Sequence, residues 1–182
     1  MGAGWQKIDI DIPENISAFD RKVMAEEIIE TIRLRTENGK DKYGISFNSY
    51  APYSKEYKES LDFKIAGKTS KVNLKQTGDM LAAIELLSDK KGKLTIGFEK
   101  GTLENDKADG HITGNIGVKR DFLGFAGSSE KQKLKSIISK YEQKNESKIE
   151  RAILWTSSKA LRTKRSKPTD MVETDNFEDL ID

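Results

Sequence analysis

The sequence predicts an α+β fold in which a small antiparallel sheet is packed by a long amphipathic helix, followed by an extended C-terminal arm. Three observations predict this class. Segments 5–12 and 93–98 alternate apolar and polar residues, as half-buried strands do. Residues 17–37 carry apolar side chains at helical spacing. The end of the chain separates its charges into a basic block and an acidic block.

The N-terminal strand and the helix after it are the most regular segments. In "WQKIDIDIP", Ile8, Ile10 and Ile12 fall on one face, and Pro13 ends the strand because it has no backbone N–H for the sheet. The helix is expected over residues 17–37. Its apolar stripe is predicted to consist of Phe19, Val23, Ala25, Ile28, Ile29 and Ile32.

The middle of the chain predicts two helices and a strand. A short helix is expected after Ser54, and a second helix is expected from Thr77, which is a favourable N-cap residue. Gly92 marks a turn into a strand that ends near Phe98. The apolar side chains of the second helix that are expected to face inward are Met80, Leu81, Ile84 and Leu87.

The C-terminal part of the chain predicts more helix. "LENDKADGHITGNIGV" reads as a short helix that ends near Gly110–Gly114. A third long helix is expected to be capped by Ser128 or Ser129 and to reach about Lys144. One more helical stretch is expected around Trp155, and the polar sequence after it predicts disorder. The inward side chains of the third helix are predicted to be Leu134, Ile137, Ile138 and Tyr141.

The charges predict a domain over residues 1–145 and a charged arm over residues 146–182. Residues 131–167 contain twelve Lys or Arg against three Glu, a net charge of +9. Residues 168–182 contain six acidic residues and no basic residue, a net charge of −6. Blocks of like charge are typical of interaction segments or of disorder.

Composition excludes several classes of protein. The 182-residue chain has no cysteine, which excludes disulfides, thiolate catalysis and cysteine-ligated zinc. No apolar run approaches the roughly 20 residues of a membrane-spanning helix. The N-terminus shows no basic region followed by an apolar stretch, so no secretory signal is expected. We therefore expect synthesis in a reducing cytoplasm and no membrane partner.

Three motifs that could carry chemistry are incomplete. "AGKTS" at residues 66–70 resembles part of a phosphate-binding loop, but Asp62 stands where that loop needs a glycine. His111 is the single histidine, and local hydrogen bonds at a helix end explain it better than catalysis. Asp9 and Asp11 could hold a divalent cation, but a solvated strand face is the preferred interpretation. We predict no enzymatic activity: no catalytic, cofactor-binding or metal-binding residues, no cofactors and no small-molecule substrate.

The stretch "KRDFLGF" places three large apolar residues around Gly124. It is expected to form a strand or a tight turn in which Phe122 and Phe125 anchor the third helix to the sheet. Two interpretations stay open for Leu123 and Phe125. Either all three large side chains belong to the core, or one of these two is available to a neighbouring protein.

The basic segment 131–167 also has two interpretations. It could neutralise DNA phosphates, with Tyr141 or Trp155 available to stack on bases. Alternatively, many of its cations form the solvated face of a helix, and the segment docks an acidic tail or tolerates nearby DNA. The second interpretation is preferred.

Four fragments follow one another in the order found in a known family. They are "LRTENGKDKYGISFNSYAPYS" (34–54), "VNLKQTGDMLAAI" (72–84), "KADGHITG" (107–114) and "KRDFLGF" (119–125). Within the first fragment, the spaced residues of the family motif are Gly39, Asp41, Gly44, Phe47 and Tyr50. Together the fragments resemble the phage virion morphogenesis family, which contains tail-completion and neck proteins of tailed bacteriophages. The resemblance covers about residues 16–140. It departs from the family at Lys119, where a proline is usual near the arginine, and in the charged arm, which has no counterpart.

The resemblance implies a structural protein of the virion, at the head–tail junction. It would be a tail-completion, neck or tail-terminator protein, with copies that form a ring, six being the expected number, around the DNA channel and join the tail to the capsid. Its partners would be further copies of itself, neighbouring connector and tail-tube proteins, and the genomic DNA in the lumen. Assembly would take place in the host cytoplasm. The alternative is a small DNA-binding protein that uses residues 131–167.

Twelve residues are predicted to contact partners. They are Trp5, Ile8, Ile10, Leu123, Phe125, Trp155, Arg162, Lys164, Arg165, Asp175, Glu178 and Asp179. The N-terminal strand is expected to pair with the sheet edge of a neighbouring copy. The acidic end is expected to dock on the basic segment of an adjacent copy, because head-to-tail contacts in a ring allow an arm to lie across the neighbour.

Overall fold

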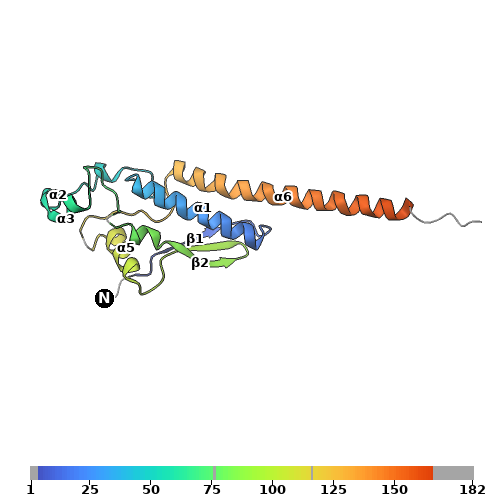
Figure 1. The fold of residues 1–182 in the computed structure, drawn as a ribbon, viewed down its shortest axis with the longest axis horizontal. Helices are drawn as coiled ribbons and strands as arrows, with labels where there is room; N and C mark the ends of the chain where they lie inside the picture. Colours follow the sequence, from blue (N-terminus) through green and yellow to red (C-terminus); the bar gives the residue numbers. More distant parts are fainter. Residues whose placement is uncertain (1–3, 76, 116, 166–182) are drawn as a thin grey trace, which may run out of the picture. The chain divides into compact units, whose positions relative to one another are not determined.

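The computed structural model describes residues 4–75, 77–115 and 117–165. Beyond Arg151 it describes the backbone without the side chains. The chain divides into two units, Met1–Asn145 and Glu146–Asp182. The first unit contains a three-stranded antiparallel sheet together with several helices, which confirms the predicted α+β class (Figure 1).

The sheet has the strand order β1-β3-β2. Both β1 (Lys7–Asp11) and β2 (Glu85–Lys90) pair in antiparallel fashion with the central strand β3 (Lys93–Gly97). Ile10 lies opposite Leu94 in this register, and both side chains are buried on the core face. The predicted strands in segments 5–12 and 93–98 are therefore confirmed as β1 and β3. Within the described ranges, the outer edges of β1 and β2 have no strand beside them.

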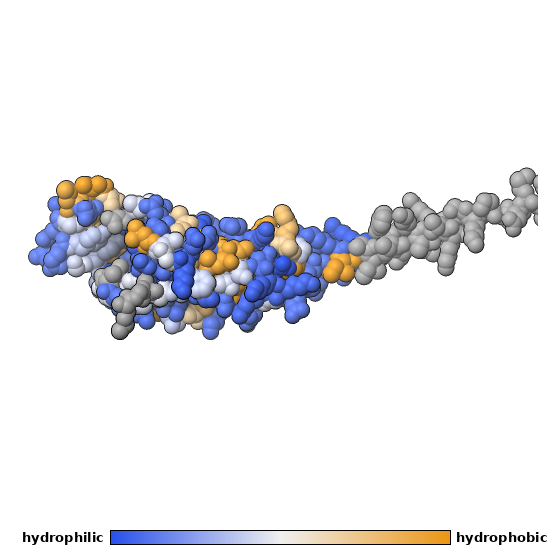
Figure 2. Space-filling view, turned by 90° about the horizontal axis from the view of Figure 1, so that it is seen from below, coloured by the Kyte–Doolittle hydropathy of each residue, from blue (hydrophilic) through white to orange (hydrophobic). Residues whose placement is uncertain are grey.

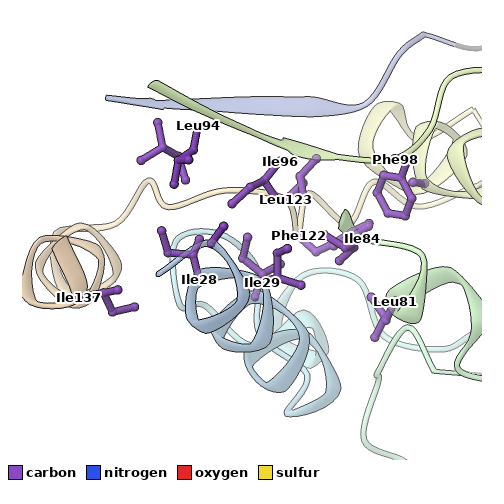
Figure 3. Close-up of a cluster of buried hydrophobic side chains, with 14 of the residues drawn as sticks. Ile28, Ile29, Leu81, Ile84, Leu94, Ile96, Phe98, Phe122, Leu123 and Ile137 are labelled. Carbon is purple, nitrogen blue, oxygen red and sulfur yellow. The ribbon is translucent and has the colours of Figure 1, made fainter. Parts of the chain in front are cut away.

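Helix α1 (Ala18–Glu37) lies against the core face of the sheet. It begins after Ser17, whose hydroxyl accepts a hydrogen bond from the backbone N–H of Asp20 at 3.1 Å and so satisfies one of the first donors of the helix. Ile28 and Ile29 of α1 point toward the side chains that descend from β3 (Figure 3). This layer forms the centre of the core.

Part of the predicted stripe of α1 is wrong. Phe19 is 71% exposed and Val23 is 39% exposed. Asp20 and Arg21 take inward positions beside them because each has a partner: Arg21 donates to Asp89 and to the Ile16 carbonyl, and Asp20 accepts from Lys144. The buried apolar side of α1 consists of Met24, Ala25, Ile28, Ile29 and Ile32.

The helix predicted from Thr77 through Leu87 is also wrong in its length. Helix α4 spans Asp79–Ala82, and β2 follows almost at once. The guanidinium of Arg33 donates to the carbonyls of Leu81, Ala82 and Ile84 at 2.7–2.9 Å. These bonds occupy carbonyl groups that a longer helix would need for its own hydrogen bonds. The leucines of β2 lie instead in a strand that pairs with β3. Met80, Leu81 and Ile84 are buried, as expected.

Short helices fill the connections of the first unit. They are η1 (Phe47–Ser49), α2 (Lys55–Glu59), α3 (Leu61–Ile65) and α5 (Leu103–Thr113). The single helix predicted after Ser54 is divided in two, because the hydroxyl of Ser60 accepts a hydrogen bond from the Phe63 N–H and caps a new helix. Helix α5 ends at Thr113 with Gly114 as its C-cap, within the range predicted for its end.

Helix α6 spans Ser128–Arg165 and belongs to both units. The sequence predicts two separate helical stretches here and disorder from about residue 159, whereas the helix continues to Arg165. In the first unit, Ile137 and Tyr141 of α6 are buried in the core. Asn145 closes this contact, since its side-chain amide donates to the Asn15 carbonyl at 2.6 Å.

Candidate functional site

The four fragments that carry the family resemblance meet at one end of the first unit. The backbone N–H of Arg120 donates to the His111 carbonyl at 2.7 Å. The guanidinium of Arg120 donates to the Ala51 carbonyl at 2.9 Å. The backbone N–H of Val72 donates to the side chain of Asn48 at 2.7 Å. Residues far apart in the sequence therefore build one continuous region.

Asp41 organises the loop of the first fragment. Its carboxylate is buried and accepts hydrogen bonds from the backbone N–H groups of Tyr43 and Ile45, each at 2.9 Å, and from the hydroxyl of Tyr50 at 3.0 Å. Burial and the neighbouring Asp41 carboxylate raise the pKa of Tyr50, so the phenol stays a hydrogen-bond donor at neutral pH. The spacing of this motif is explained by local folding of the loop.

The FLGF stretch is an irregular turn, with Gly124 at φ +109°, where a residue without Cβ is favoured. Phe122 is fully buried and packs edge-on against Phe98, with ring centroids 6.3 Å apart. Leu123 is 6% exposed, so it belongs to the core. Phe125 is half-buried, and its ring lies 5.2 Å from the guanidinium carbon of Arg35.

Beside the meeting point of the fragments is an open pocket of about 770 Å³. The loop before α2, the loop before α4, helix α5 and the segment after it all line it. Its aromatic and basic lining residues are Tyr53, Tyr57, Lys68, Lys107, His111 and Arg120. Asp79 also lines it, and the Thr77 hydroxyl donates to the Asp79 carboxylate at 2.7 Å.

Two cations of the pocket lie close to the Tyr53 ring. The Lys68 ammonium is 5.9 Å from the Tyr53 ring centroid, and the Arg120 guanidinium carbon is 5.8 Å from it. Tyr53 also packs against Tyr57 and Phe63, at centroid distances of 5.2 and 5.6 Å. These contacts join the aromatic wall of the pocket to its two cations.

The two cations have no carboxylate partner. In the part of the chain that the structure describes, the ion pairs involve neither Lys68 nor Arg120. Lys68 instead donates to the Asn73 side chain at 2.7 Å, and Arg120 donates to backbone carbonyls. Burial lowers the pKa of each group. An anion entering the pocket would relieve this uncompensated positive charge.

His111 contributes a neutral imidazole to the pocket. Burial and the nearby Arg120 charge lower its pKa to about 4. Its Nδ1 atom is shielded from water and has no hydrogen-bond partner among the described residues. The expected set of local hydrogen bonds is therefore incomplete at Nδ1. The described residues contain no cluster of three or more His, Asp or Glu that could hold a metal ion.

The "AGKTS" segment forms part of the loop that follows α3. Lys68 of this segment turns back toward Asn73 and the Lys75 carbonyl, and thereby closes the loop after α3. On β1, the Asp9 carboxylate accepts from the Thr95 hydroxyl at 2.8 Å and pairs with Lys93 at 3.3 Å.

The predicted N-terminal contact residues occupy three different environments. Trp5 is partly exposed, and its indole N–H donates to the Phe98 carbonyl at 2.7 Å. Ile8 is half-buried and packs on the core, whereas Ile10 is buried within it. Within one copy, Ile10 and Leu123 are therefore core residues, and little of either side chain is left for a neighbour to contact.

The remaining predicted contact residues are not described in the same detail. Trp155, Arg162, Lys164 and Arg165 lie in α6, where the backbone is described and the side chains are not. Asp175, Glu178 and Asp179 lie outside the described residues. Their contacts stay predictions.

Several cations of the basic segment are used within the first unit. Lys140 pairs with Glu27 at 2.8 Å and Lys144 pairs with Asp20 at 2.8 Å, so both join α6 to α1. Lys133 pairs with Glu130 at 2.6 Å. Paired lysines contribute less to a phosphate-binding surface than unpaired ones.

The pocket was not predicted from the sequence. Tyr53, Lys68 and Arg120 are separated by long stretches of chain, and no local spacing connects them. A usable signal was the position of Arg120 in one family fragment and of Tyr53 at the end of another.

Comparison with known proteins adds no relative to these observations: no family model, no curated protein and no solved structure matches the chain. Within the described ranges, no helix combines the length and apolar composition needed to cross a bilayer.

Proposed function

We propose that this chain is a structural virion protein of the phage head–tail junction, a tail-completion, neck or tail-terminator protein whose copies form a ring around the DNA channel. The observation that carries the proposal is the exposure of large apolar side chains on a folded domain. Leu61 and Ile65, one turn apart on α3, are 70% and 75% exposed. Contiguous exposed apolar groups favour contact with another protein.

Further apolar side chains are exposed elsewhere on the first unit. Phe19 and Val23 lie one turn apart on α1, and Tyr43 and Ile45 lie in the loop after it. Figure 2 shows several separate hydrophobic patches on a face that is otherwise mostly hydrophilic. Several separate patches suit a subunit with more than one neighbour, as heterologous contacts in a ring require.

The sheet supports the same proposal. In the described ranges β1 and β2 each present an edge without a paired strand. An unpaired edge can accept a strand from another chain through backbone hydrogen bonds. The N-terminal segment before β1 would be brought to the edge of a neighbour in this way.

DNA binding by residues 131–167 is the alternative function. The ion pairs of Lys140 and Lys144 with α1 reduce the positive charge that α6 offers to DNA. In the proposed ring, Lys140 and Lys144 would lie in a subunit that surrounds the DNA. They would not determine how tightly the ring binds it. A steep salt dependence of binding to naked duplex would favour the alternative.

Electron microscopy of particles assembled with the gene disabled tests the proposal. Separate DNA-filled heads beside finished or over-long tails are expected, and the tail lengths would distinguish a terminator from a neck protein. Supplying the wild-type chain in trans should restore joined particles. Intact particles with joined tails in the absence of the chain would contradict the proposal.

A further inference from the structure

The pocket beside Tyr53 has more positive than negative side chains in its lining. Lys68, Lys107 and Arg120 line it, against Asp79 as the carboxylate among the described lining residues. The Asp79 carboxylate already accepts the Thr77 hydroxyl. Lys107 lies 3.8 Å from Glu104, a loose and partly exposed pair. The pocket therefore has an excess of positive charge.

The walls of the pocket add an aromatic surface to this charge. Tyr53 and Tyr57 face it, and Leu74, Met80 and Val118 provide apolar lining. A ligand that fits this lining carries several negative charges together with at least one aromatic or aliphatic group. A peptide with alternating acidic and apolar residues has this chemistry.

The chain itself contains such a peptide. Its last residues read "ETDNFEDLID", in which carboxylates surround Phe177, Leu180 and Ile181. Residues 168–182 contain six acidic residues and no basic residue. The charge and the apolar content of this segment both match the lining of the pocket.

We propose that the pocket lined by Lys68, Lys107 and Arg120 binds the acidic C-terminal segment of a second copy of this chain. The inference rests on the proposal that copies assemble. It differs from the expectation that the acidic end docks on the basic segment of α6, because Lys133, Lys140 and Lys144 are already paired. In a ring, the contact would repeat from each copy to the next.

Disulfide trapping in the full-length chain tests the contact, since the chain has no native cysteine. Asn176→Cys in a chain with a size tag is mixed with an untagged chain that carries one other cysteine. Three partners are compared: Val118→Cys in the pocket, Ser139→Cys in the basic segment of α6, and Asp11→Cys on β1. Mixed dimers are separated by size on a gel without reductant.

The pocket variant is expected to form mixed dimers several-fold faster than the other two. Adding Lys107→Gln to the pocket chain should slow its trapping by about two- to fivefold, the range of one partly exposed ion pair. The matched Lys93→Gln, at an exposed ion pair on the sheet, should leave the rate unchanged. About 1 M salt should also slow trapping, because it screens charges beyond about 3 Å.

Equal rates for Val118→Cys and Asp11→Cys would overturn the inference. Faster trapping at Ser139→Cys would overturn it as well and would favour docking on the basic segment of α6. Sedimentation of the same chains under reducing conditions separates the two proposals. Assembled copies without pocket trapping contradict the inference alone, whereas a monomer at all concentrations contradicts the proposed ring.

Discussion

Arg35 and Glu130 form an ion pair that is almost completely shielded from water. The guanidinium and the carboxylate are 3.1 Å apart, and each side chain is 3% exposed. Arg35 lies in the last turn of α1 and Glu130 in the first turn of α6, so the pair joins the two longest helices. Arg35 also donates to the Phe122 carbonyl, which connects both helices to the FLGF turn.

Replacing Glu130 by Gln should lower the free energy of unfolding by about 3–5 kcal/mol, because it leaves a buried guanidinium without its counter-charge. The measurement is urea unfolding followed by circular dichroism. Asp9→Asn is the matched control, since it removes the exposed pair with Lys93 and should cost less than about 1 kcal/mol. Similar losses of unfolding free energy for both variants would show that the buried Arg35–Glu130 pair stabilises the fold no more than an exposed pair does.

The Arg35–Glu130 ion pair makes the stability of the fold depend on pH. Burial by itself raises the pKa of Glu130, but hydrogen bonds from Lys133 and Arg35 lower the pKa below its ordinary value overall. A carboxyl whose pKa is lower in the folded chain stabilises the fold above its unfolded pKa, about 4.3, and loses this contribution as pH falls through the folded value. Wild type should therefore lose stability more steeply below about pH 5 than Glu130→Gln does. Parallel curves would contradict this.

His111 should titrate far below an ordinary histidine. Its pKa of about 4 follows from burial and from the Arg120 charge. Because it is the single histidine, one imidazole signal in a proton NMR titration reports it directly. Since the unfolded chain binds this proton more tightly, with a pKa of about 6.5, the fold should lose stability as pH falls from that value toward the folded pKa. A midpoint near 6.5 in the folded protein would contradict the buried environment.

Gly39 should tolerate a side chain worse than Gly101 does. Both have positive φ, +75° and +83°. A Cβ at Gly39 would lie 2.5 Å from the Val72 carbonyl oxygen, whereas a Cβ at Gly101 meets nothing within 4 Å. Gly101→Ala should cost about 1–2 kcal/mol through strain, and Gly39→Ala should cost clearly more because backbone must also move. Thermal unfolding of both variants measures the two losses of stability. Equal losses would show that the close approach of Gly39 to the Val72 carbonyl does not matter.

The exposed apolar pair on α3 should matter for assembly and not for folding. Leu61→Lys with Ile65→Lys should leave circular dichroism and the unfolding midpoint nearly unchanged, because both side chains are already exposed. Sedimentation velocity should show loss of higher oligomers if α3 contacts a neighbour. Leu103→Lys, at another exposed leucine, is the control. Unchanged oligomers in the double variant would exclude α3 as a contact.

Local patterns in the sequence were sufficient for several elements. The alternation in "KIDID" and "KLTIG" predicts β1 and β3 because a strand has a period of two that few other structures share. The apolar side chains at helical spacing over residues 17–37 predict α1, since this spacing acts within a few residues, although Phe19 and Val23 are exposed. The α+β class follows from these elements together.

Tertiary contacts decided the rest. The segment "IELLSDK" suits a helix or a strand by its own pattern, and pairing with β3 together with the Arg33 bonds makes it β2. Phe19 points outward because the partners of Asp20 and Arg21 come from distant parts of the chain. The cationic pocket exists because the His111–Arg120 and Arg120–Ala51 contacts bring separate fragments together. The sequence by itself determines what depends on neighbouring residues, whereas burial, ion pairing and the shape of a pocket depend on residues that only the folded chain brings within reach.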